Sequence, residues 1–188
     1  MSIASDLKQS IDETLMLVPK LVELEPQLTR LAETLLKGWS NGKKLLVAGN
    51  GGSCADAIHF AEELSVRFQK NRKALAAIAL ADASAMTCAG NDFGFDTVFS
   101  RQVEALGQAG DVLAVFTTSG NSQNMVSAVD AAKARGVITC GFLGKGGGKL
   151  KGVCDIELIV PSDSTARIQE AHKLLFHTLC VYIDRHVD

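Results

Sequence analysis

Five short apolar runs recur along the chain from residue 45 onward, and a longer stretch with helical periodicity separates each run from the next. Within each run the apolar residues are continuous rather than alternating with polar ones, a pattern typical of parallel strands covered on both faces. The runs are residues 45–48, 76–80, 112–116, 137–142 and 156–160. Because neighbouring parallel strands need a crossover connection, this pattern predicts an α/β fold with a doubly wound, five-stranded parallel sheet.

The first 40 residues contain no such run. Their apolar residues, from Ile3 to Val22 and beyond, recur at three- and four-residue steps, and Pro19 and Pro26 interrupt the pattern. We therefore expect two helices, or one helix that bends, ahead of the first strand. Helices in this place have no crossover to make, so they pack either against a partner subunit or against the sheet of their own chain.

Composition excludes several classes of function. The 188 residues, 47% hydrophobic and 21% charged, indicate one compact domain with an apolar surplus that favours burial between subunits. A net charge of -2 offers no basic stripe for nucleic acid. Five cysteines without C-x-x-C spacing indicate neither a disulfide framework nor a zinc ribbon, and they fit a reducing cytoplasm. The sequence shows neither a signal peptide nor an apolar window long enough to span a membrane.

The ends of the strands carry the residues of chemical interest, because ligands of such sheets bind beyond the carboxyl ends. The first run ends in NGGS, residues 50–53, and leads into a helix that carries His59 and Glu63. Residues four apart project from one helix face, so this pair can meet a single ligand or metal. The third run ends in TTSGNS, residues 117–122, where hydroxyls and free amides at a helix N-terminus suit a phosphate. The same residue types also form ordinary capped turns.

Two later segments are less specific. GKGGG, residues 144–148, follows the fourth run, and a glycine-rich segment there is usually only a turn. The last helix is expected from about Thr165 to His186, led by Asp163 or Ser164. At 100° per residue, Gln169 and His177 lie about 80° apart and can serve one site, whereas His172 lies about 140° from His177. A lone histidine in an apolar helix is more often a core residue than a ligand.

Four segments together resemble a known family: AGNGGSCADAIHFAEEL, AGNDFGFDTVFSRQVEALG, TTSGNSQNMVSAVDAAKARG and ARIQEAHKLLFHTL. Through nearly its whole length the chain is similar to the sugar isomerase (SIS) proteins and, among them, to the phosphoheptose isomerases. The resemblance implies a flavodoxin-like SIS fold, with residues 1–188 as one SIS domain. It also implies a homotetramer, in which residues 1–40 form a helical extension used in oligomerisation.

The resemblance further implies roles for individual residues. Glu63 and His177 match the catalytic base and acid of the family. The family binds one Zn²⁺ per subunit through ligands that match His59, Glu63, Gln169 and His177, although His59 could instead contact substrate. The phosphate would be held by Thr117, Thr118, Ser119 and Ser122. The remaining substrate contacts would come from Asn50, Gly51, Gly52, Ser53, Asn91, Asp92 and Gln169.

The implied activity is the conversion of sedoheptulose 7-phosphate to D-glycero-D-manno-heptose 7-phosphate through an enediol. This reaction is the first step toward ADP- or GDP-heptose precursors of surface polysaccharide. It needs a carboxylate base and an acid, types that Glu63 and His177 supply. One alternative is a non-catalytic SIS adaptor that binds the replication initiator protein, and another is an isomerase of a different sugar phosphate. The retained Glu63 and the intact TTSGNS argue against the adaptor.

Overall fold

The sheet predicted from the apolar runs is present. The computed structural model describes residues 2–188, and within them five parallel strands form one sheet in the order β2-β1-β3-β4-β5. The strands are β1 (Leu45–Gly49), β2 (Ala77–Ala79), β3 (Val112–Thr117), β4 (Ile138–Leu143) and β5 (Ile156–Ile159). The chain moves from β1 out to β2 and then crosses back over β1 to β3, so the strand order reverses between β1 and β3. In sheets of this flavodoxin-like order the ligand crevice opens at that reversal.

The central strands show why their apolar runs are continuous. Every residue of β1 and β3 is buried, and the two strands pair in register from Leu45 opposite Val112. Leu45 points into the core on one face of the sheet and Leu46 into the core on the other. The edge strand β2 differs from the prediction, because Ile78 is 41% exposed. An edge strand has a neighbour on one side only, so coverage of both faces was a wrong expectation for this run.

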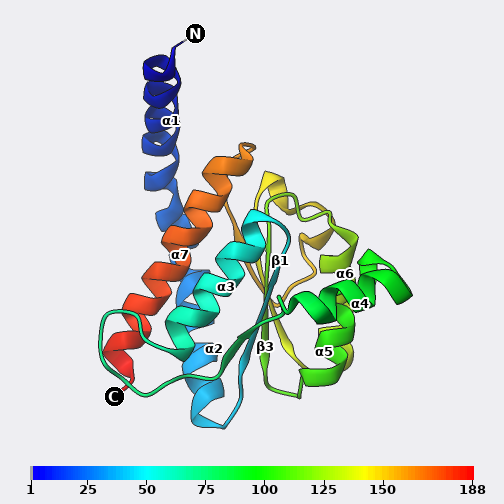
Figure 1. Ribbon diagram of the computed structural model, residues 1–188. Helices are drawn as coiled ribbons and strands as arrows, with labels where there is room; N and C mark the ends of the chain where they lie inside the picture. Colours follow the sequence, from blue (N-terminus) through cyan, green and yellow to red (C-terminus); the bar gives the residue numbers. More distant parts are fainter. Residues whose placement is uncertain (1) are drawn as a thin grey trace.

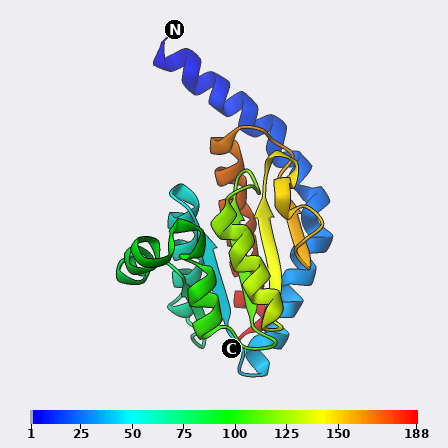
Figure 2. The same cartoon turned by 90° about the vertical axis from the view of Figure 1, so that its right-hand side faces the viewer.

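Helices cover both faces of the sheet (Figure 1). One layer contains α2 (Glu25–Ser40), α3 (Gly52–Ser65) and α7 (Thr165–His186). The other layer contains α4 (Ala83–Phe93), α5 (Ser100–Leu106) and α6 (Gln123–Ala134). Two short 3₁₀ segments, η2 (Phe95–Thr97) and η3 (Lys145–Leu150), lie in the connections. Seen from the side, α4 stands away from the body of the molecule (Figure 2).

The N-terminal segment forms two helices, as predicted. α1 (Ile3–Leu17) is followed by the 3₁₀ segment η1 (Val18–Leu24) and then by α2. Pro19 lies at the start of η1 and Pro26 in the first turn of α2, where a missing N–H is tolerated. α1 projects from the body (Figures 1 and 2), and large apolar side chains along it are exposed. They are Ile3, Leu7, Ile11, Leu15 and Met16.

The C-terminal helix α7 begins where it was predicted to begin. Ser164 occupies its N-cap position, and α7 buries residues on several sides against α3 and the sheet. Although α7 has 22 residues, neither it nor any other helix within residues 2–188 combines the length and apolar character needed to cross a bilayer.

Candidate active site

Two loops meet where the strand order reverses. The turn predicted to meet the sugar, here called the sugar turn (residues 50–53), follows β1. The loop predicted to bind phosphate, here called the phosphate loop (residues 117–122), begins at the last residue of β3; these two strands are paired as far as Gly49 opposite Phe116. The side chains of Asn50 and Asn124 join the sugar turn to the start of α6 (Gln123–Ala134), just beyond the phosphate loop, through two hydrogen bonds in which each Nδ2 donates to the Oδ1 of the other at 2.9 Å. The sugar turn and the phosphate loop therefore border one crevice.

Glycines make the sugar turn tight. Gly51 has a φ of +55° and occupies the N-cap position of α3. A Cβ on Gly49 would collide with the Ser53 carbonyl, and a Cβ on Gly52 would lie 2.7 Å from Gln169 Nε2. Gln169 Nε2 also donates to Ser53 Oγ at 3.4 Å. The absence of side chains thus lets the turn pack directly against α7.

Of the predicted phosphate-binding residues, Thr117 is the last residue of β3, and Thr118, Ser119 and Ser122 lie between β3 and α6. Two of their hydroxyls shape the loop. Thr117 Oγ1 accepts the Gly120 N–H at 3.2 Å, and Ser119 Oγ accepts the Asn121 N–H at 3.2 Å. Ser122 occupies the N-cap position of α6, but its side chain makes no cap hydrogen bond. Because an ordinary capped turn would use that hydroxyl, its availability at a helix N-terminus favours an anion-binding loop.

The glycine-rich segment after β4, residues 144–148, packs directly against the backbone of the phosphate loop. A Cβ on Gly120 would collide with the Gly147 carbonyl, and a Cβ on Gly148 would collide with the Ser119 carbonyl. The Lys149 N–H donates to Asn121 Oδ1 at 3.0 Å, which ties the two segments together. This segment is therefore more than a turn, since its glycines make the close approach of the two backbones possible.

A cluster of ionisable side chains lies between α3 and α7. His59 Nε2 and Glu63 Oε1 are 2.9 Å apart, and the rings of His59 and His177 are 5.0 Å apart in an edge-to-face arrangement. One ligand atom from each of these three residues lies within 4.8 Å of those of the other two, so the three could hold a metal ion. The predicted face of α3 and the predicted face of α7 thus meet in space.

His177 is poised to act as an uncharged group. Burial, followed by the neighbouring His59, lowers the pKa of His177, so its imidazole is neutral at neutral pH. Its Nε2 is buried and has no hydrogen-bond partner within residues 2–188. His172 lies elsewhere, as predicted: its Nε2 contacts the Leu143 carbonyl at 3.1 Å, and burial lowers its pKa to about 4.

Gln169 lies near the sugar turn rather than in the His/Glu cluster. It precedes His177 by eight residues, a helical rise of about 12 Å. Between them, Lys173 Nζ lies 3.3 Å from Asp56 Oδ1 of α3. The contacts of Gln169, Lys173 and His177 therefore follow one another along the seam between α3 and α7, from the sugar turn to the cluster.

Asn91 and Asp92 are not brought to the crevice of their own chain. Both are exposed at the end of α4, which Figure 2 shows standing away from the body. Asn91 Nδ2 donates to Asp92 Oδ1 at 2.7 Å, and Cys88 Sγ lies 3.5 Å from Asp92 Oδ2. Their side-chain contacts are thus local to α4.

Arg72 and Asp184 form a buried ion pair next to the cluster, which no sequence pattern predicted. Arg72 Nε donates to Asp184 Oδ1 of α7 at 2.7 Å, and the Arg72 guanidinium also donates to the carbonyls of Glu63 and Leu64 at the end of α3. Burial alone would raise the pKa of Asp184, but hydrogen bonds from the Lys70 N–H and from Arg72 outweigh it and lower that pKa. The pair ties together the two helices that carry the cluster.

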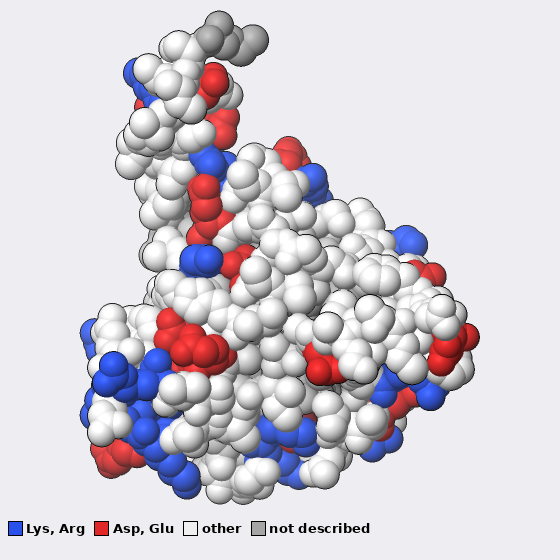
Figure 3. All heavy atoms as spheres, in the orientation of Figure 1, with Lys and Arg blue, Asp and Glu red and all other residues white. Residues whose placement is uncertain are grey.

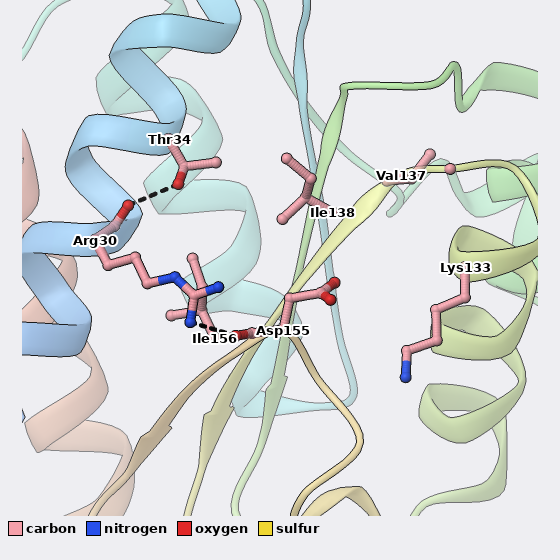
Figure 4. Close-up of a pocket in the computed structure, with 8 residues that line it drawn as sticks. Arg30, Thr34, Lys133, Val137, Ile138, Asp155 and Ile156 are labelled. Atoms are coloured by element: carbon pink, nitrogen blue, oxygen red, sulfur yellow. Dashed lines mark hydrogen bonds between the residues drawn. The ribbon is translucent and has the colours of Figure 1, made fainter.

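Other charged features lie away from the crevice. Figure 3 shows Lys and Arg side chains gathered at the lower left of the molecule, around the connection from α3 to β2 and the end of α7. A hollow of about 570 Å³ lies at the amino-terminal ends of β4 and β5, whereas the crevice lies at the carboxyl ends of the strands (Figure 4). There Arg30 already donates to the Asp155 carbonyl at 2.9 Å, and the Asp155 carboxylate accepts from Thr139. These groups are engaged in holding the chain, so the hollow is a weaker candidate for a site.

The chain is similar to known proteins over most of its length. A family profile described as the SIS domain matches residues 11–144. Phosphoheptose isomerase 1 from Campylobacter jejuni serotype O:2 is 54% identical over 162 residues, which cover 86% of this chain and 87% of that protein. The solved structure of a phosphoheptose isomerase from Neisseria gonorrhoeae matches with a TM-score of 0.91 at 42% identity, covering 98% of this chain and 100% of that one. A phosphoheptose isomerase structure from Francisella tularensis matches with a TM-score of 0.95 at 38% identity, with the same coverage.

Proposed function

This chain belongs to the SIS domain family, and we infer that it is a phosphoheptose isomerase, an intramolecular aldose–ketose isomerase. It converts sedoheptulose 7-phosphate to D-glycero-D-manno-heptose 7-phosphate, the first step toward the nucleotide-activated heptose of surface polysaccharide. The observation that carries this conclusion is the cluster of His59, Glu63 and His177, two of them on the helix that follows the sugar turn, in a chain about half identical to phosphoheptose isomerases. The adaptor and the other sugar phosphates are not favoured.

We propose that Glu63 is the base and His177 the acid of the proton transfer. An enediol forms when a base removes a proton from the carbon next to the carbonyl while an acid protonates the carbonyl oxygen. The Glu63 carboxylate would take that proton and return it to the neighbouring carbon. The neutral imidazole of His177, with its buried and unpartnered Nε2, supports a role in proton exchange with the oxygen.

The substrate would lie across the crevice. Its phosphate would bind the phosphate loop through the hydroxyls of Thr117, Thr118, Ser119 and Ser122 and the N-terminus of α6. Its sugar hydroxyls would meet Asn50, Gly51, Gly52 and Ser53, with Gln169 alongside. Asn91 and Asp92, exposed on α4, would meet the sugar bound in a neighbouring subunit.

We propose one Zn²⁺ per subunit, held by the cluster of His59, Glu63 and His177. Gln169, the predicted fourth ligand, would have to give up its contact with Ser53 to reach the ion. Imidazole, carboxylate and amide oxygen donors are acceptable to zinc, and ligand atoms of His59, Glu63 and His177 lie within 4.8 Å of one another. When bound, zinc would polarise a substrate oxygen as a Lewis acid. Metal analysis of the purified protein should give about one zinc per chain. Full activity without detectable metal would refute a catalytic role for zinc.

We propose that residues 1–188 form one SIS domain that assembles as a homotetramer in the cytoplasm. The exposed apolar side chains along α1 support assembly through residues 1–40, because such surface is otherwise left in water. Leu7→Glu together with Ile11→Glu should reduce the tetramer to smaller species in multi-angle light scattering. The double variant Ala4→Glu with Gln9→Glu, at two exposed positions of the same helix, would control for added charge because it also adds two negative charges. A tetramer that survives the first pair would place the interface elsewhere.

The experiment that tests the activity is incubation with sedoheptulose 7-phosphate, followed by NMR. Signals of the aldose heptose 7-phosphate should appear with the wild-type chain and stay absent without protein. If the heptose phosphate is left unchanged while a hexosamine phosphate is isomerised, the proposed substrate is wrong.

A further inference from the structure

The amide pair of Asn50 and Asn124 spans the reversal in strand order. Asn50 directly follows β1, and Asn124 is the second residue of α6, just beyond the phosphate loop. Asn124 is 2% exposed, so its amide is removed from water. In the pair each side-chain amide donates one N–H and accepts at its carbonyl oxygen, and both Nδ2 to Oδ1 distances are 2.9 Å. Two parallel bonds fix distance and orientation together, as a single bond does not.

Within residues 2–188, hydrogen bonds between side chains connect the sugar turn to α6, the helix after the phosphate loop, through this pair. The other contacts of the two loops lead elsewhere. Ser53 contacts Gln169 of α7, and Asn121 accepts from Lys149 of η3. Each loop thus has its own support behind it, and the amide pair sets one loop relative to the other.

We propose that Asn124 is a positioning residue that sets the spacing between the sugar turn and the phosphate loop. This inference rests on the proposed function, in which one sugar phosphate is held by both loops at once. A substrate that is bound at both ends has a high affinity only when the spacing of the two binding loops matches its length. Asn124 acts through Asn50, which keeps its second N–H for the sugar.

Asn124→Asp tests the pair with almost no change in shape. At about pH 8 the ionised carboxylate only accepts hydrogen bonds, so one of the two bonds becomes a contact between two oxygens. The substrate must then restore the loop spacing that the lost hydrogen bond held, which should raise KM for sedoheptulose 7-phosphate about 10- to 100-fold. When protonated, the carboxyl group again offers one donor and one acceptor and restores the pair. The excess KM over wild type should therefore shrink as the pH falls toward about 5.5, since burial raises the pKa of a carboxyl group.

Inorganic phosphate separates positioning from general damage, because it binds the phosphate loop alone. Its inhibition constant should change less than about threefold in Asn124→Asp while KM for the heptose phosphate rises. Asn124→Leu should show the same rise in KM with no recovery at low pH. Asn71→Asp, at an exposed asparagine, is the matched control and should behave as wild type. A wild-type KM in Asn124→Asp, a loss independent of pH, or a parallel loss of phosphate binding would each overturn the proposal.

The failure of the proposed function has a different signature. If wild type itself does not isomerise the heptose phosphate, the assigned activity is wrong, whatever the variants do. Urea unfolding can then still test whether the two asparagines form the pair, because it measures the free energy of unfolding without substrate. The free energy of unfolding of Asn124→Asp should be lower than that of Asn71→Asp, and this difference should become smaller as the pH falls from about 8 to 5.5. A constant deficit would show that the second hydrogen bond is not restored and would refute the pairing.

Discussion

Replacing Arg72 with methionine should destabilise the protein by about 4 kcal/mol. The Arg72 side chain is fully buried and its partner Asp184 is 7% exposed, at an Nε to Oδ1 distance of 2.7 Å. The guanidinium also donates to the carbonyls of Glu63 at 2.8 Å and of Leu64 at 3.0 Å, at the end of α3. Methionine retains much of the aliphatic volume but removes every donor.

The magnitude follows from what stays behind. Removing one partner of a buried ion pair typically costs about 3–5 kcal/mol, because the other charge is left without compensation. Asp184 would keep the N–H groups of Gln69 and Lys70, at 3.0 and 2.9 Å, which places the loss inside that range rather than above it. For a chain of this length, about 4 kcal/mol corresponds to a fall of about 10 °C in Tm.

Urea unfolding measures the loss, and Lys8→Met provides the control. Lys8 and Asp12 form an ion pair of similar length, 2.6 Å, but their side chains are 75% and 52% exposed. Such exposed pairs contribute about 1 kcal/mol or less. Both variants are compared at one protein concentration, because assembly makes apparent stability depend on it. Equal, small losses in the two variants would refute the argument that burial makes the Arg72–Asp184 pair important.

Three further outcomes are expected. Glu63→Gln and His177→Gln should each lower turnover by about 10²- to 10⁴-fold while the protein stays folded, and near wild-type turnover in either would remove that residue from the mechanism. The pKa of buried His172, about 4 when folded, lies below its unfolded value, so its contribution to stability is fully present above about pH 6.5 and is lost as the pH falls toward 4. His172→Gln should reduce the loss of unfolding free energy between pH 7 and 4 by about 3 kcal/mol, and an unchanged pH slope would contradict this. Gly148→Ala should weaken binding of inorganic phosphate, because a Cβ there would collide with the Ser119 carbonyl. Gly146→Ala, also at positive φ but with open space around it, should leave phosphate binding unchanged. Equal phosphate affinity in the two variants would rule out support of the phosphate loop by this segment.

The layers of the fold, and the carboxyl ends of the strands as the place to look for the site, could be predicted from the residues of each segment alone. Continuous apolar runs record burial on both faces of a strand, and this pattern is local, so β1 and β3 could be read from their own residues. Helical spacing likewise predicted that His59 and Glu63 share one face and that His172 lies apart from His177. It did not reveal that Ile78 would be exposed, because which strand lies at the edge depends on the order of pairing.

Contacts between residues far apart in the sequence could be seen only in the folded chain. Asn50 and Asn124 are 74 positions apart, and Arg72 and Asp184 are 112 apart, so no periodicity connects them. The glycines of η3 looked like a simple turn until the fold placed them against the phosphate loop. These contacts arise from the packing of whole elements, whereas the pattern of a single segment reports only how that segment meets its surroundings. The residues that set the shape of the crevice were therefore visible only once the sheet had been assembled.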